Sequence, residues 1–147
     1  MSQVIFPKNY KSKLSVKETQ RAIKLIKDTF QVKLAKVLNL DRVTAPIIVR
    51  SDSGINDDLN GIERKVTFDL KEMDGQIEVV QSLAKWKRLE VTEMGMKPGC
   101  GISTDMNAIR PDEELDAVHS LYVDQWDWCM AIDEKDRTVF YLFDIVK

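Results

Sequence analysis

Two strand patterns joined by a short connection set the strongest constraint on the fold. Residues 103–110 and 119–128 both carry the pattern of a β-strand, and only residues 111–118 join them. A parallel pair needs a crossover of about a dozen residues or more, usually a helix, and none fits within this connection. The two strands are therefore predicted to pair antiparallel.

A second antiparallel pair is predicted upstream of the first. Apolar residues alternate with other residues in 65–70 and in 76–80, which is the period of a strand with one buried face. Asp74 and Gly75 lie between these segments and are typical of a tight hairpin turn. The sequence therefore predicts a hairpin that turns at this dipeptide.

The longest predicted helix begins at a capping box. Ser15 and Glu18 have the spacing at which each side chain satisfies a free backbone donor of the first turn. Apolar residues then recur at spacings of three and four as far as Leu38, and Asn39 is expected to end the helix. The stripe consists of Ile23, Ile26, Phe30, Leu34 and Val37.

Three further segments complete the expected fold. Residues 82–95 read as a helix with Gly95 as its stop, and another helix is expected from Asp133 onward. Residues 42–50 read as one strand, in which Pro46 lacks a backbone donor and so favours a sheet edge or a subunit boundary. The sequence predicts an α+β fold in which an antiparallel sheet is flanked by helices.

Composition narrows the class of protein. The 147 residues include 22 Lys and Arg against 24 Asp and Glu, a net charge of -2, which disfavours a general nucleic-acid or membrane-surface binder. Hydrophobic residues make up 44% of the chain, as in a globular protein, and no run reaches the roughly 18 apolar residues of a membrane helix. We therefore expect a cytoplasmic protein in which Cys100, Cys129 and His119 hold no metal.

Lys87 is the first polar residue that breaks an apolar pattern. It falls inside the apolar arc of the predicted helix 82–95. A buried lysine is costly unless an anion meets it, so Lys87 is a candidate ligand for a carboxylate or a phosphate. Two alternatives are that its ammonium reaches water along the core edge, or that Glu90 on the same arc is its partner. The arc consists of Leu83, Ala84, Trp86, Val91 and Met94.

The predicted strand 119–128 changes character along one face. This face is apolar at first and then presents Gln125 and Asp127. A carboxylate beside an amide suits a ligand that carries an amine together with a carboxyl or amide group. The alternative is a strand end that emerges into solvent. Trp126 and Trp128, on the opposite face, are interpreted as core or interface residues rather than a platform for bases.

Arg110 ends the predicted strand 103–110 on the face of its apolar residues. A guanidinium is always charged and forks onto phosphate, so this position suits a nucleotide α-phosphate, although an exposed arginine at a strand end is an ordinary alternative. The turn-rich loop 54–61 adds polar groups of the kind that often bind ligands. It has neither the spacing of a Walker A loop nor a dinucleotide fingerprint.

Five segments of the chain closely resemble the aspartate-ammonia ligase family, the AMP-forming asparagine synthetases. They are residues 45–47, 56–61, 78–88 (with SLAKWKR), 106–113 and 119–128 (with YVDQWDW). The resemblance implies the catalytic fold of class II aminoacyl-tRNA synthetases. It also implies that ATP activates the side-chain carboxyl of L-aspartate as an adenylate, which ammonia converts to asparagine, with AMP and pyrophosphate as the other products.

The resemblance also implies a role for each candidate residue. Lys87 would meet the substrate carboxylate and the adenylate, and Arg110 would hold the α-phosphate. Gln125 would contact substrate and nucleotide, Asp127 would bind the ammonium group, and Asp57 would close the pocket. A separate detail is that position 81 is glutamine where some relatives have histidine.

Length is the main departure from the family. Its members are more than twice as long, and their further part carries a glycine-rich third motif with its arginine and the acidic ligands for Mg²⁺ and ATP. Residues 1–147 are therefore expected to be the N-terminal part of one catalytic domain, inactive alone, acting as a homodimer or with a complementing C-terminal chain. The alternative is a non-catalytic paralogue that binds an amino acid or dimerises. A tRNA synthetase core is disfavoured because no basic surface is present.

Overall fold

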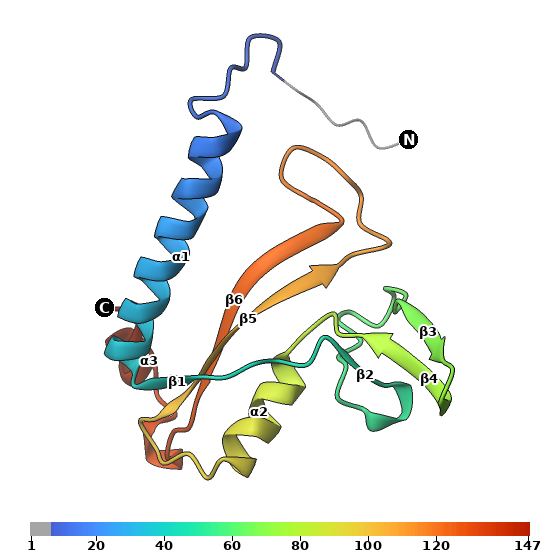
Figure 1. Ribbon diagram of the computed structural model, residues 1–147. Helices are drawn as coiled ribbons and strands as arrows, with labels where there is room; N and C mark the ends of the chain where they lie inside the picture. The colour runs from blue at the N-terminus through green and yellow to red at the C-terminus, as the bar shows by residue number, and fades with distance from the viewer. Residues whose placement is uncertain (1–6) are drawn as a thin grey trace.

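The pairing of two long strands organises the first sheet (Figure 1). The computed structural model describes residues 7–147, and in it β5 (Gly101–Ile109) pairs antiparallel with β6 (Tyr122–Met130) along their whole length. The short strand β1 (Leu40–Arg42) runs parallel to β5 on its other edge. The antiparallel pairing predicted from the short connection is confirmed, and the sheet order is β1-β5-β6.

The second sheet has the order β2-β4-β3 and is antiparallel throughout. It contains β2 (Ile48–Arg50), β3 (Thr67–Leu70) and β4 (Met73–Val79). The predicted hairpin is present, but its turn is at residues 71–72, and the prediction of a turn at Asp74-Gly75 is wrong. The register shifts after Asp69, so that this dipeptide forms a bulge in β4, where Gly75 has φ +96°. A bulge needs the same backbone freedom as a turn.

Residues 42–50 do not form the single strand that was predicted. They divide between β1 and β2, which belong to different sheets, and the residues between them cross from one sheet to the other. The crossing includes Pro46, which has no N–H to donate to a ladder. The carbonyl of the next residue, Ile47, accepts from Val80 N at 2.9 Å. Both short strands lie at sheet edges, as the proline indicated.

Helix α1 (Val16–Leu38) begins and ends as predicted. Ser15 N donates to Glu18 Oε2 at 2.8 Å, Ser15 Oγ accepts from Glu18 N at 3.3 Å, and Asn39 ends the helix with φ 53°. The hydrogen bonds from Ser15 hold the pKa of the Glu18 carboxyl below its ordinary value. Only part of the apolar stripe is covered, because Ile23, Ile26, Phe30 and Val37 are all exposed.

The other two helices are shorter than the sequence indicated. α2 (Ala84–Glu93) begins after Leu83, with Ser82 Oγ accepting from Ala84 N at 3.3 Å. Its C-cap is Met94, and Gly95 follows in the left-handed conformation. α3 (Val139–Val146) begins after Thr138, because residues 134–136 form a separate 3-10 turn. Within residues 7–147, no helix has both the length and the apolar character needed to cross a membrane.

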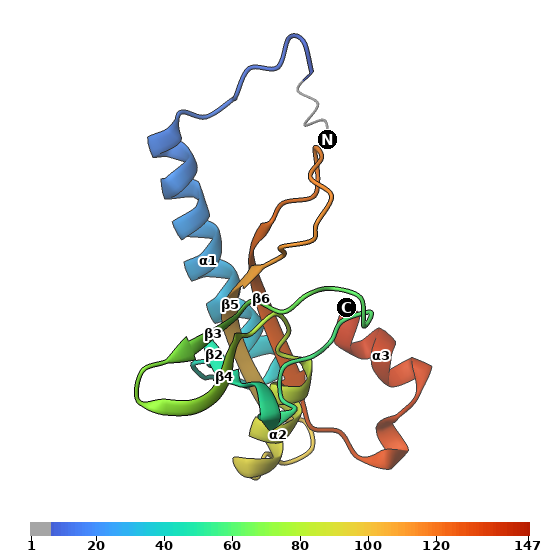
Figure 2. The same ribbon diagram turned by 90° about the vertical axis from the view of Figure 1, so that its right-hand side faces the viewer.

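The β5–β6 pair lies between α1 and α2 (Figure 2). On one face, the Trp126 ring stacks on Phe30 of α1 with centroids 5.1 Å apart, which confirms the interpretation of Trp126 as a packing residue. On the other face, α2 covers a small buried core. The core consists of Val80, Leu83, Met106 and Ala108, with Ala45, Val49, Trp86 and Val123 around it. Because α1 and α2 pack on opposite faces of the β5–β6 pair, a ligand can reach only those strand residues that the two helices leave uncovered.

We predict that Gly101→Ala disrupts the β5–β6 pair. A Cβ at this position would lie 2.2 Å from the Cys129 carbonyl oxygen and 2.7 Å from the Met130 Cα, both of them backbone atoms that cannot move aside separately. The substitution should lower the free energy of unfolding by about 3 kcal/mol or more, measured by urea titration. The control is Gly99→Ala, which meets no atom within 4 Å and should cost only about 1 kcal/mol for its φ of +82°. Equal effects of the two substitutions would contradict this packing.

Candidate functional site

Lys87 points inward from α2 and meets a carboxylate of the sheet. Its residue exposure is 8%, and its ammonium forms an ion pair with Asp127 of β6 and donates to the Trp128 carbonyl at 3.2 Å. The inward orientation predicted from the apolar arc is confirmed. The alternatives of a solvated ammonium and of Glu90 as the partner are both wrong, because Asp127 supplies the compensating charge that a buried lysine requires.

Gln125 and Asp127 lie on the same face of β6, as the strand period predicted. Asp127 lies opposite Thr104, and Gln125 lies opposite Met106, which is part of the core beneath α2. Gln125 is half-buried, and Asp127 also accepts from its neighbour Trp128 N at 3.0 Å. Both side chains therefore belong to the face that carries Lys87, and the alternative of a strand end emerging into solvent does not hold for Asp127.

Arg110 leaves the end of β5 beside a cavity of about 550 Å³. Its Nη1 donates to the Gln81 carbonyl at 3.1 Å, and its backbone N donates to Leu121 O at 2.7 Å. Arg110 is half-buried as a residue, and its guanidinium keeps donors beyond this one bond. The cavity is lined by residues of three segments, which are loop 54–61 with its continuation, the segment between β4 and α2, and the end of β5 with the residues that follow it: Leu59, Asn60, Glu63, Gln81, Ile109, Arg110, Pro111, Asp112 and Glu113. Lys87, Gln125 and Asp127 are not among them.

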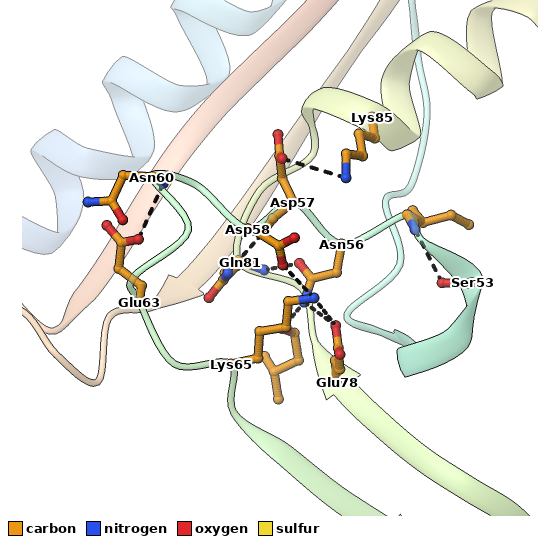
Figure 3. Close-up of polar contacts among 12 residues, drawn as sticks. Ser53, Asn56, Asp57, Asp58, Asn60, Glu63, Lys65, Glu78, Gln81 and Lys85 are labelled. Atoms are coloured by element: carbon orange, nitrogen blue, oxygen red, sulfur yellow. Dashed lines mark hydrogen bonds and ion pairs between the residues drawn. The ribbon is translucent and has the colours of Figure 1, made fainter.

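Asn56 anchors loop 54–61 to the end of β4 (Figure 3). It is only 3% exposed, and its Nδ2 donates to Glu78 Oε2 at 3.0 Å and to the Val79 carbonyl at 3.1 Å. Its Oδ1 accepts from Gln81 N at 2.9 Å. One amide side chain thus replaces the hydrogen bonds that a neighbouring strand would make at this point.

A lysine bridges the same loop to the buried Glu78. Lys65 Nζ lies 2.7 Å from Asp58 Oδ1 and 3.3 Å from Glu78 Oε2. The bond to Asp58 raises the pKa of the Lys65 ammonium and lowers the pKa of the Asp58 carboxyl. Glu78 is 5% exposed, so the lysine and the Asn56 amide together compensate a buried carboxylate.

Asp57 is held at the rim of α2 rather than beside Lys87. Its carboxylate lies 3.8 Å from Lys85 Nζ, and its carbonyl accepts from Gln81 Nε2 at 2.7 Å. The structure therefore groups the predicted site residues in two parts. Gln125 and Asp127 share one face of β6, and Lys87 meets Asp127 there from α2. Asp57 and Arg110 are instead both hydrogen-bonded to Gln81.

The connection between β5 and β6 is tied to the segment before β3. Arg64 donates to Asp112 through Nε and through its backbone N, both at 2.8 Å, and this lowers the pKa of the Asp112 carboxyl. Further along, His119 Nδ1 lies 2.8 Å from Asp116 Oδ2, and the bond raises the pKa of the imidazole. Of these residues, Asp112 lines the cavity next to Arg110, so the bond from Arg64 holds part of the wall of that cavity.

Sequence reasoning missed the residues that hold the loop. Asn56, Glu78 and Gln81 are buried because loop 54–61 folds over the end of β4, a contact that no local period encodes. A signal was available in Asn56, which lies in the predicted polar loop. Within residues 7–147, no three His, Cys, Asp or Glu side chains gather as a metal-binding group.

Together these features define a candidate site for a small charged molecule on an α+β scaffold. The model of the aspartate-ammonia ligase family matches residues 17–147, and the chain belongs to that family. It is 58% identical to the aspartate--ammonia ligase of Bacteroides thetaiotaomicron over 99% of this chain, and 54% identical to that of Clostridium perfringens strain 13 over 100% of it. These matches cover 43% and 44% of the relatives, so the chain spans less than half of their length.

We predict that Lys87 and Asp127 are energetically coupled. Lys87→Met and Asp127→Asn should each lower the free energy of unfolding by about 2 kcal/mol, because each leaves the partner charge poorly compensated. The double variant should lose at least about 1 kcal/mol less than the sum of the single losses, measured in a urea double-mutant cycle.

A second cycle at Lys24 and Asp28 provides the control for that measurement. These residues form an ion pair on α1 with side chains 77% and 61% exposed, and water screens such a pair. This cycle should show no measurable coupling. Additive losses at Lys87 and Asp127 would show that the buried pair does not act as a unit.

Proposed function

We propose that this chain forms the substrate-binding part of an ATP-dependent aspartate-ammonia ligase. Its membership of the family supports the assignment. The single observation that carries it is the ion pair between the buried Lys87 and the half-buried Asp127, with Gln125 on the same face of β6 as Asp127. The Lys87 cation can bind a carboxylate and the Asp127 anion can bind an ammonium group, and an amino acid carries both of these groups.

In the proposed binding step, L-aspartate exchanges partners with the ion pair. Lys87 and Asp127 compensate each other in the free chain, so neither charge is left unpaired before the ligand arrives. L-Aspartate would bring its side-chain carboxylate to Lys87 and its ammonium to Asp127. Gln125 would add an amide that can donate and accept. The exchange replaces one ion pair by two, which offsets the cost of separating the first pair.

The proposed reaction has two steps. A side-chain carboxylate oxygen of aspartate attacks the α-phosphorus of ATP, and pyrophosphate leaves with the electrons of the broken P–O bond. Ammonia then attacks the acyl carbon, loses a proton, and displaces AMP to give asparagine. A free carboxylate resists this attack, and adenylation supplies the leaving group.

Arg110 is proposed to bind the α-phosphate. Its guanidinium opens onto the cavity of about 550 Å³, and the bond to the Gln81 carbonyl leaves other donors of the planar fork for phosphate oxygens. Negative charge spreads over those oxygens in the transition state, where a fixed cation is most effective. Asp57 would close the amino-acid end of the site. The described residues offer no cluster of three ligating side chains that could hold Mg²⁺.

We also propose the wider architecture that the family resemblance suggests. The antiparallel β5–β6 pair, with α2 packed on one face, is compatible with part of a class II synthetase-like catalytic domain. The exposed apolar residues of α1, among them Ile26 and Phe30, support a homodimer formed through this helix. Both cysteines are free, as they would be in a reducing cytoplasm.

The test joins this chain to the part of the Bacteroides thetaiotaomicron ligase that follows the matched region. We predict that the joined protein forms asparagine and AMP only when aspartate, ATP and ammonia are all present, and that the 147-residue chain alone has no turnover. Lys87→Met should lower kcat/KM for aspartate at least about 100-fold.

The matched control for this substitution is Lys71→Met, at an exposed position in the turn between β3 and β4. It should leave kcat/KM for aspartate unchanged. A joined protein that folds but makes no asparagine would contradict the proposed function and favour a non-catalytic binding module. Full activity of Lys87→Met would instead contradict the role of Lys87.

A further inference from the structure

Gln81 is hydrogen-bonded both to Asp57, which Figure 3 shows beside it, and to Arg110. It is 3% exposed and lies between the end of β4 and the start of α2. Its side-chain Nε2 donates to the Asp57 carbonyl at 2.7 Å, and its own carbonyl accepts from Arg110 Nη1 at 3.1 Å. One residue is therefore bonded to a proposed amino-acid-binding residue and to a proposed phosphate-binding residue.

Gln81 is itself fixed by the anchor of the loop. Its backbone N donates to Asn56 Oδ1 at 2.9 Å, and Asn56 Nδ2 donates in turn to the buried Glu78 carboxylate and to the Val79 carbonyl. These groups are buried, and a buried hydrogen bond that is lost leaves a costly unpaired group. The hydrogen bond to Asn56 thus fixes Gln81 beside the end of β4. Gln81 in turn holds its two other partners, Asp57 and Arg110.

We propose that Gln81 is a positioning residue whose side-chain N–H holds Asp57 at the amino-acid end of the site, while its backbone carbonyl holds Arg110 at the phosphate end. This inference rests on the proposed function. Position 81 then requires a side-chain N–H donor with the reach of glutamine. Histidine has such a donor, so histidine at this position is expected to satisfy the same requirement.

The hydrogen bond to Asp57 comes from the side chain of Gln81, and the hydrogen bond from Arg110 goes to its backbone carbonyl. A substitution of Gln81 should therefore affect the two partners differently. A substitution changes only the side chain, so Asp57 loses its partner while Arg110 keeps the backbone carbonyl. The KM for aspartate should therefore rise and the KM for ATP should not. Damage to packing in general would affect both constants, because the same segment supports both ends.

The kinetic test uses the protein joined to the remainder of the Bacteroides thetaiotaomicron ligase. Gln81→Met, which is similar in size and has no donor, should raise the KM for aspartate about tenfold and leave the KM for ATP within about twofold. Gln81→Asn, whose amide is one methylene shorter, should behave like Gln81→Met. Gln81→His should stay within about threefold of the original protein. Gln76→Met, at an exposed position in β4, is the matched control and should change neither constant.

A second measurement needs no activity and uses the 147-residue chain itself. Amide hydrogen exchange in residues 54–61 should be about tenfold faster in Gln81→Met than in the original chain, because the loop loses its bond to Gln81. Exchange of the Arg110 amide, which donates to Leu121 O, should not change.

The outcomes separate this inference from the proposed function. Unchanged exchange in 54–61, or an equal rise in both KM values without rescue by Gln81→His, would overturn the role of Gln81. An inactive joined protein whose loop nevertheless exchanges faster in Gln81→Met would overturn the proposed function and leave the positioning contact established.

Discussion

The antiparallel pairing of β5 with β6 is the constraint on which the rest of the structure depends. It places Gln125 and Asp127 on the face that α2 covers, and it carries Arg110 to the mouth of the neighbouring cavity. The opposite face receives α1 through the stacking of Trp126 on Phe30. The same register leaves no room for a side chain at Gly101, so the pairing is set by backbone contact as well as by hydrogen bonds.

The Lys87–Asp127 ion pair supplies the charged groups of the candidate site on this sheet face. A buried ion pair contributes little net stability, because desolvation offsets much of the attraction. Its value to the proposed function is that the buried Lys87 and the half-buried Asp127 are both in position before a ligand arrives. The loop network around Asn56 and Gln81 adds a second ordered region, and it joins that region to Arg110 through one backbone carbonyl.

Local patterns predicted the parts of the fold and of the site that depend on nearby residues. Helical period placed Lys87 inward, strand period placed Asp127 on the same face as Gln125, and the short connection required β5 and β6 to pair antiparallel. The split of 42–50 between two sheets, the bulge at Gly75 and the burial of Asn56 and Gln81 were not predictable in this way. The split and the buried loop contacts depend on partner segments far away in the chain, whereas the bulge depends on the register of the β3–β4 hairpin, whose turn lies at residues 71–72.

The central claim is that Lys87 and Asp127, which pair with each other in the free chain, separate to hold the side-chain carboxylate and the ammonium of L-aspartate. A crystal structure of the joined protein with a non-hydrolysable sulfamoyl analogue of the aspartyl-adenylate tests it most directly. The account predicts the aspartyl carbonyl group beside Lys87, its ammonium on Asp127, and the sulfamoyl group on Arg110. An intact Lys87–Asp127 pair, with the analogue bound elsewhere, would contradict it.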